Sequence, residues 1–192
     1  GYELLLEDGK LAFGLHHMWP GNSLKIASKA KLPTNESVHV AVTYDGSSRA
    51  HGVRVFINGE SAATEVIRDG LRKDITYGGD EPELTIGYRF RDNGFKGGRV
   101  DEFKVYSRAL SAIEVAGLAG KLSLTNVFAN AMSEAGRDQL FAYFFANAYE
   151  PAQKLAKELH ALRDEQRKLI NPIPEIMAVE EMPRPKPAYI LK

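Results

Sequence analysis

The chain of 192 residues contains no cysteine. This absence excludes disulfides, thiolate metal ligands, cysteine nucleophiles and thioether-attached haem within these residues, and it leaves the cellular compartment open. No apolar run approaches the roughly 18 residues that a membrane-spanning helix requires, so we expect no membrane span. Net charge is also absent, because 25 basic residues stand against 25 acidic ones. Nucleic acid is therefore not expected as a partner.

Glycine is almost missing from the last third of the chain. Sixteen of the seventeen glycines lie in residues 1–120, whereas five of the nine prolines lie in residues 172–192. This shift predicts three parts: a turn-rich β domain over 1–120, a helical connector over 121–170, and an extended proline-rich segment over 171–192.

Short β-branched and aromatic runs between turn dipeptides predict about eight strands in the first part. Asp8-Gly9 and Asn58-Gly59 are two-residue hairpin signals, because both turn positions require a positive φ. Many strands with no long helix between them predict a mainly β fold, an antiparallel jelly-roll sandwich. The expected strands span 2–7, 10–16, 24–28, 37–44, 52–57, 60–67, 84–88 and 98–106.

Helical signals begin after this β part. Ser111 and Glu114 form a capping box, in which the hydroxyl and the carboxylate satisfy free backbone N–H groups. An aromatic helix is expected over 133–148, and an amphipathic one with leucines on one stripe over 151–170. We expect these two helices to form an antiparallel hairpin that buries its apolar stripe against a partner.

Three segments together resemble a known family: 38–46 (VHVAVTYDG), 53–59 (VRVFING) and 95–111 (FKGGRVDEFKVYSRALS). They are similar to laminin-G-like domains with the concanavalin A-like jelly roll, although Val38 stands where that family often has tryptophan. The resemblance implies a lectin-type fold, a polysaccharide or glycan as ligand, and calcium in some members.

A narrower resemblance involves 19–22 (WPGN), 87–98 (GYRFRDNGFKGG) and 173–192 (IPEIMAVEEMPRPKPAYILK). These segments are similar to large planctomycete proteins in which a laminin-G-like insert lies between uncharacterised domains beside a cytochrome-c-type domain. This implies a periplasmic, extracellular or cell-surface location, haem elsewhere in the parent protein, and a piece that lacks the first strands of the jelly roll. Other domains or fragments of the parent are then expected to supply those strands, or the piece self-associates.

No catalytic residue is expected in this piece, whereas the activity of the parent stays open. Asp101 and Glu102 are adjacent on an expected strand, so their side chains diverge and cannot act as a glycosidase pair. We expect Asp101 to be a buried acceptor for a backbone or arginine donor.

Seven residues are predicted to bind a ligand. An exposed Trp19 beside His17 can stack on a sugar face, or the indole can instead plug the sandwich or contact a neighbouring domain. The loop after the strand at 84–88 offers donors beside a stacking tyrosine, or its charged pair is only a solvated turn. The predicted ligand-binding residues are Trp19, His17, Tyr88, Arg89, Arg91, Asp92 and Asn93.

Metal and cofactor signals are weak. His16 and His17 diverge as consecutive strand residues, so at most one can ligate a metal. Calcium is possible at an acidic cluster that lacks the dense oxygen spacing of a calcium loop, namely Asp80, Glu81 and Glu83. We expect no cofactor in this piece.

Two functions follow. The first is a non-catalytic carbohydrate-binding or protein-interaction module within a larger multidomain protein. The alternative is a structural insert that packs the neighbouring domains of a haem-containing or glycan-degrading parent enzyme and binds nothing itself.

Overall fold

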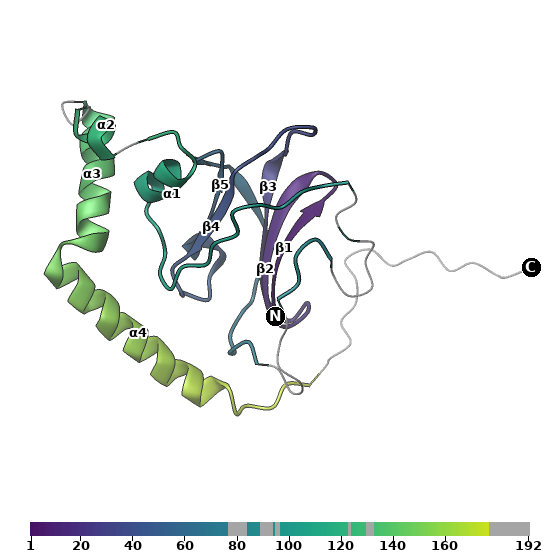
Figure 1. Ribbon diagram of the computed structural model, residues 1–192. Coiled ribbons are helices and arrows are strands. Elements are labelled where there is room, and N and C mark those ends of the chain that lie inside the picture. Colours follow the sequence, from purple (N-terminus) through teal and green to yellow (C-terminus); the bar gives the residue numbers. More distant parts are fainter. Residues whose placement is uncertain (77–83, 89–93, 95–96, 123, 130–132, 177–192) are drawn as a thin grey trace, which may run out of the picture.

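The computed structural model describes residues 1–76, 84–88, 94, 97–122, 124–129 and 133–176. It is a β sandwich with an arm of helices along one side (Figure 1). One antiparallel sheet has the strand order β1 (Tyr2–Glu7), β2 (Lys10–Met18), β3 (Asn22–Lys31) and β7 (Thr64–Asp69). The other has the order β4 (Val40–Tyr44), β5 (Val53–Ile57) and β6 (Glu60–Ser61).

Both predicted hairpin turns are confirmed. Asp8 and Gly9 have φ angles of 51° and 82°, and Asn58 and Gly59 have φ angles of 51° and 80°. These left-handed pairs match the right-handed twist of the flanking strands, so they set the β1–β2 and β5–β6 registers.

The hydrophobic core lies between the two sheets. Alternate residues of each strand face it, as period two requires. Val40 and Val42 of β4 lie on one side of the strand and pack against this core. Its buried members are Leu11, Leu15, Leu24, Ile26, Ala50, Val53, Val55 and Leu71.

The strand predicted over 60–67 is two strands in different sheets. β6 pairs with β5, whereas β7 pairs with β3. The chain changes sheets at Ala62 and Ala63, which belong to neither strand. The sequence pattern does not reveal this change of sheet, because apolar residues continue through it.

The strands predicted over 84–88 and 98–106 are not present as strands. Gly87 has a φ of 75° and Glu102 a φ of 53°, so both segments leave the extended conformation within their length. Val105 and Phe103 are 79% and 52% exposed. Neither segment pairs with any strand in the part of the chain that the structure describes.

The predicted helices are confirmed and one more is added. The short helix is α1 (Ala112–Leu118), with the Ser111–Glu114 capping box formed in both directions. The unpredicted α2 (Leu124–Ala129) precedes α3 (Glu134–Asn147) and α4 (Glu150–Ile170). None of the described helices is long and apolar enough to cross a membrane.

The antiparallel packing expected for the last two helices is not what the structure has. Figure 1 shows α3 and α4 meeting end to end as an elbow. The leucines of α4 are consequently left in solvent, with Leu155, Leu162 and Leu169 between 62% and 75% exposed. At the elbow itself, Tyr149 packs against Phe144 and Phe145 of α3, with ring centroids 6.0 and 5.6 Å apart.

The second half of α4 contacts the sandwich through its polar side. Arg163 Nη1 donates to the backbone oxygen of Asp45 at 3.3 Å, and Arg167 Nε lies 3.3 Å from Asp74 Oδ1. Asn171 then exchanges hydrogen bonds with Asp74 through its amide group. Lys73 Nζ donates to the backbone oxygen of Ile173, and Asn22 Nδ2 donates to Glu175 Oε1 at 2.5 Å, so the chain after α4 contacts the sandwich as far as Glu175.

Candidate functional site

Trp19 lies on the outer face of the first sheet, immediately after β2. Its indole is 52% exposed. Two cations lie near the ring, with Lys25 Nζ 5.5 Å and the Arg68 guanidinium 5.8 Å from the ring centroid. The His16 ring meets it edge-on at 5.4 Å. The indole therefore has charged and aromatic neighbours while about half of its surface faces solvent, which leaves area for stacking.

The cations belong to one row across the sheet. Glu3 pairs with Gly14, Gly14 with Lys25, and Lys25 with Arg68 in consecutive strands. Lys25 lies flat over the row and is 8% exposed, with Nζ 3.4 Å from Glu3 Oε1 and 2.6 Å from Glu7 Oε1. These carboxylates compensate the charge of Lys25, as burial of an ammonium group demands.

Gly14 makes this row possible because it has no side chain. A Cβ built at this position would lie 2.3 Å from His16 Nε2. His16 therefore folds over the glycine and brings Nε2 to 3.2 Å from Glu3 Oε1. The missing side chain at position 14 therefore leaves the space in which the imidazole lies next to Trp19.

His17 does not join Trp19. Its Nδ1 lies 2.6 Å from the backbone oxygen of Asp74, whereas His16 reaches Glu3 on the outer face. The two histidines diverge as predicted for consecutive strand residues.

The second predicted set lies largely outside the described residues. Tyr88 is 58% exposed, and its backbone oxygen accepts a hydrogen bond from Thr85 Oγ1 at 2.9 Å. The structure does not describe Arg89, Arg91, Asp92 and Asn93, nor the acidic cluster Asp80, Glu81 and Glu83. Within the described ranges, no three His, Asp or Glu side chains are placed to hold a metal ion.

The expected burial of Asp101 is wrong. Asp101 and Glu102 are both exposed, because the left-handed backbone at Glu102 breaks the strand on which the prediction depended. Asp101 does accept a backbone hydrogen bond, from the N–H of Glu102 at 2.8 Å. Glu102 forms an ion pair with Lys104.

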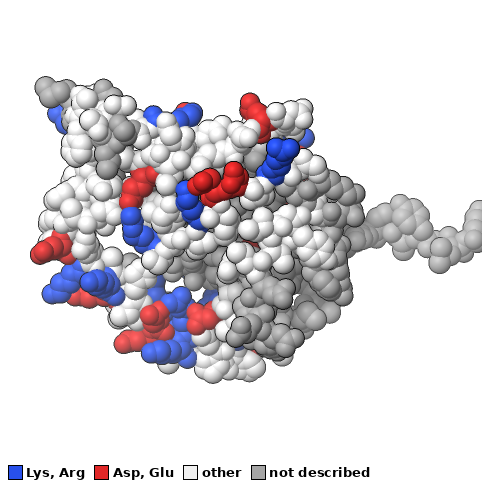
Figure 2. Space-filling view, viewed as in Figure 1, with Lys and Arg blue, Asp and Glu red and all other residues white. Residues whose placement is uncertain are grey.

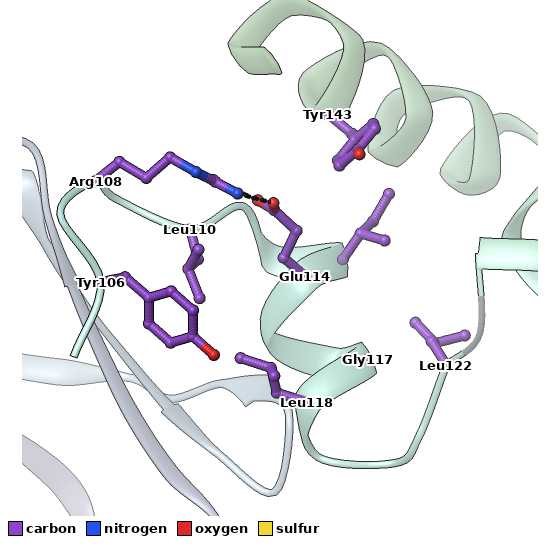
Figure 3. Close-up of a pocket in the computed structure, with 9 residues that line it drawn as sticks. Tyr106, Arg108, Leu110, Glu114, Gly117, Leu118, Leu122 and Tyr143 are labelled. Carbon is purple, nitrogen blue, oxygen red and sulfur yellow. Dashed lines mark hydrogen bonds and ion pairs between the residues drawn. The ribbon is translucent and has the colours of Figure 1, made fainter. Parts of the chain in front are cut away.

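A separate cavity of about 340 Å³ lies where α1 meets α3 (Figure 3). Tyr106 and Leu110 approach it from the segment before α1, and Tyr143 from α3. Its polar element is the ion pair between Arg108 and Glu114, with Nη2 2.5 Å from Oε1. These groups already have partners, so we interpret the cavity as a joint between helices.

The electrostatics of Glu114 agree with this interpretation. Hydrogen bonds from Arg108, and then from the backbone and hydroxyl of Ser111, lower the pKa of Glu114 to about 2 despite partial burial. A carboxylate with such a pKa stays ionised and does not serve as an acid near neutral pH.

Sequence reasoning missed the neighbours of Trp19. The sequence indicates His16 only as a possible metal ligand, and no motif in it marks Lys25, Arg68 or Glu3. The signal was present in their outward strand positions, but the row depends on registers that include irregularities in the β2–β3 and β3–β7 pairings.

Comparison with known proteins identifies the class of this domain. Residues 1–116 match the family model described as the Concanavalin A-like lectin/glucanases superfamily, of the laminin-G type. The chain belongs to this family. No curated protein sequence matches it.

A solved structure also matches: residues 221–444 of an S-layer domain-containing protein from Clostridium thermocellum ATCC 27405. The identity is 25% and the TM-score 0.32, over 62% of this chain. The match spans 55% of that chain, about half its length.

Proposed function

We propose that this domain is a non-catalytic carbohydrate-binding module whose sugar platform is the outer surface around Trp19. The observation that carries the proposal is the half-exposed indole lined by Lys25 and Arg68. The C–H face of a pyranose stacks on such a ring, and its hydroxyls find donors and acceptors in Arg68, His16 and Glu3. Membership of a lectin-type family supports a binding role in general.

The only tryptophan of the chain gives a direct test, because its fluorescence reports on the platform itself. Titration of the chain with soluble polysaccharides should shift the emission saturably and slow acrylamide quenching. Trp19→Ala should weaken retardation in affinity electrophoresis at least about fivefold, since a stacked ring contributes about 1 kcal/mol or more. Phe141→Ala is the matched control, because Phe141 is an exposed aromatic on α3.

If no polysaccharide changes the emission, or if Trp19→Ala binds as tightly as the native chain, the platform does not exist. The second candidate then gains weight: a structural insert that packs neighbouring domains. The exposed aromatic and leucine side chains of α3 and α4 favour it, among them Phe141, Phe144, Phe145, Leu155 and Leu162.

Within either role, we propose that the parent protein supplies a strand to the free edge of β1. Gly1 and His16 exchange both backbone hydrogen bonds, so the odd residues of β1 bond to β2 and the even ones direct N–H and C=O outward. Tyr2, Leu4 and Leu6 are also 71%, 49% and 47% exposed on the side that faces the core. An extended apolar segment would satisfy both the edge and these side chains.

The parent is proposed, from the sequence resemblance alone, to be a planctomycete multidomain protein located in the periplasm or at the cell surface. Haem and any enzymatic activity would then lie outside this chain. Absorption spectra of the full-length parent, together with an activity screen on complex glycans, test this assignment.

A further inference from the structure

A second cavity, of about 200 Å³, lies between the second half of α4 and two loops of the sandwich. One loop follows β4 and the other follows β7. Four arginines line this cavity: Arg49 and Arg72 from the loops, and Arg163 and Arg167 from α4. Four arginines around one small cavity favour the binding of negative charge there.

The carboxylates nearby compensate only part of this charge. Arg167 is paired with Asp74 and Asp164. Arg163 donates to a backbone oxygen, which carries no charge to offset its own. Asp69, the carboxylate in the lining, accepts a hydrogen bond from the backbone N–H of Ala50 at 2.8 Å.

Arg49 and Arg72 are both exposed. Their guanidinium groups make no hydrogen bond or ion pair with any residue that the structure describes. Both belong to the sandwich side of the cavity, opposite the arginines of α4. The lining therefore holds more positive than negative charge, and two of its guanidinium groups are free to bind an anion.

The other polar residues of the lining carry no charge. Ser47 belongs to the loop after β4, and its buried Oγ lies beside Gly52 rather than in the cavity. Ser48 and Gln166 contribute further donors to the wall.

We propose that this cavity binds a tetrahedral oxyanion, a phosphate or a sulfate group. Guanidinium groups match two oxygens of such an anion in fork geometry, and the volume admits the group with part of an attached sugar. Because the arginines come from both sides, the bound anion would hold α4 against the sandwich. The site is separate from Trp19 and does not depend on the sugar platform.

The test uses the full chain and two probes, inorganic sulfate and a monosaccharide sulfate ester, titrated by calorimetry against sodium chloride of equal ionic strength. Saturable binding of sulfate is expected, with a rise in the melting temperature that chloride does not produce. R49A/R72A should weaken binding at least tenfold, and Arg163→Ala should weaken it from the α4 side. Arg54→Ala, an exposed arginine on β5, is the matched control and should bind as the native chain does.

The two probes distinguish the source of the anion. At least tenfold tighter binding of the ester assigns the site to sulfated or phosphorylated sugars, and equal affinities assign it to the free anion. The proposal is overturned if neither probe binds saturably at matched ionic strength, or if R49A/R72A binds unchanged while circular dichroism shows a native fold. Trp19→Ala should leave this binding intact, so failure of the sugar platform is distinguishable from failure of the oxyanion site.

Discussion

At the scale of single residues, Gly14 has the largest influence on the candidate site. It lies in the middle of β2, where a side chain would occupy the space of the His16 imidazole. Glycine in a strand interior weakens the strand, and here it allows His16 to reach across the sheet toward Glu3.

Gly14→Ala is expected to displace His16 from Glu3 while the backbone keeps its course. The clash involves the end of a side chain that can rotate, so the cost should be in the lower part of the roughly 1–3 kcal/mol range for overpacking. We expect the emission of Trp19 to shift and polysaccharide binding to weaken several-fold. Gly21→Ala is a control, because no atom lies within 4 Å of its added Cβ. Equal binding by both variants would show that His16 does not shape the platform.

Local features of single residues could be predicted from the sequence, whereas the two candidate sites could not. The Ser111–Glu114 capping box and the Asp8-Gly9 turn are local patterns, and both were predicted correctly. The surroundings of Trp19 require the register of four strands. The arginine cavity requires Arg49 and Arg163 to meet across more than a hundred residues, which no local pattern records.

At the scale of elements, the start of α1 is the best-defined electrostatic unit. Glu114 accepts from the backbone and hydroxyl of Ser111 and is paired with Arg108. The carboxylate lies in the first turn, where the helix dipole favours negative charge. The same interactions fix the segment before α1 to the helix.

We expect Glu114→Gln to lower the free energy of unfolding at pH 7 by about 1–2 kcal/mol. This is the typical contribution of a helix cap that contains hydrogen bonds to a charged group. The folded pKa of Glu114, about 2, is below the ordinary value of 4.5, so the stabilisation is present above pH 4.5. It is lost as the pH falls from 4.5 toward 2. Urea unfolding across this window should show the two proteins converge. A constant difference down to pH 2 would mean that the carboxylate charge contributes nothing.

The bounds of α3 and α4 agree with those predicted from the sequence, whereas their packing does not. Helix ends depend on nearby caps, such as Ser133, whose hydroxyl accepts from Gly136 N–H. The direction of α4 depends instead on Arg163 and Arg167 reaching the sandwich. An amphipathic stripe predicts that a helix has an apolar side, but not what that side will meet.

At the scale of the whole molecule, no strand among the described residues pairs with the outer edge of β1, and the inward side chains of β1 are partly exposed. Long uncovered edges promote association between chains. The helical arm lies along the side of the sandwich nearer β4 and β5 (Figure 1). On the face viewed in Figure 2, acidic and basic side chains are mixed, so no single-sign field opposes association.

The isolated chain is therefore expected to self-associate with rising concentration when no parent strand is present. Light scattering after size exclusion should show mass above 21.2 kDa, and Leu4→Lys on β1 should return it to the monomer. Val66→Lys on the opposite edge strand is the matched control, since Val66 is 61% exposed. A native chain that stays monomeric over the whole concentration range contradicts the open edge.

The crossing between β6 and β7 has a consequence for how the molecule unfolds. Only Ala62 and Ala63 separate the two strands, and a link of that length spans at most about 10 Å, close to the spacing of packed sheets. The sheets therefore cannot move apart while β6 and β7 stay paired, because their tether is already near its full reach. Opening the core must break one of these ladders, so loss of either sheet is transmitted to the other and the sandwich melts as one cooperative unit.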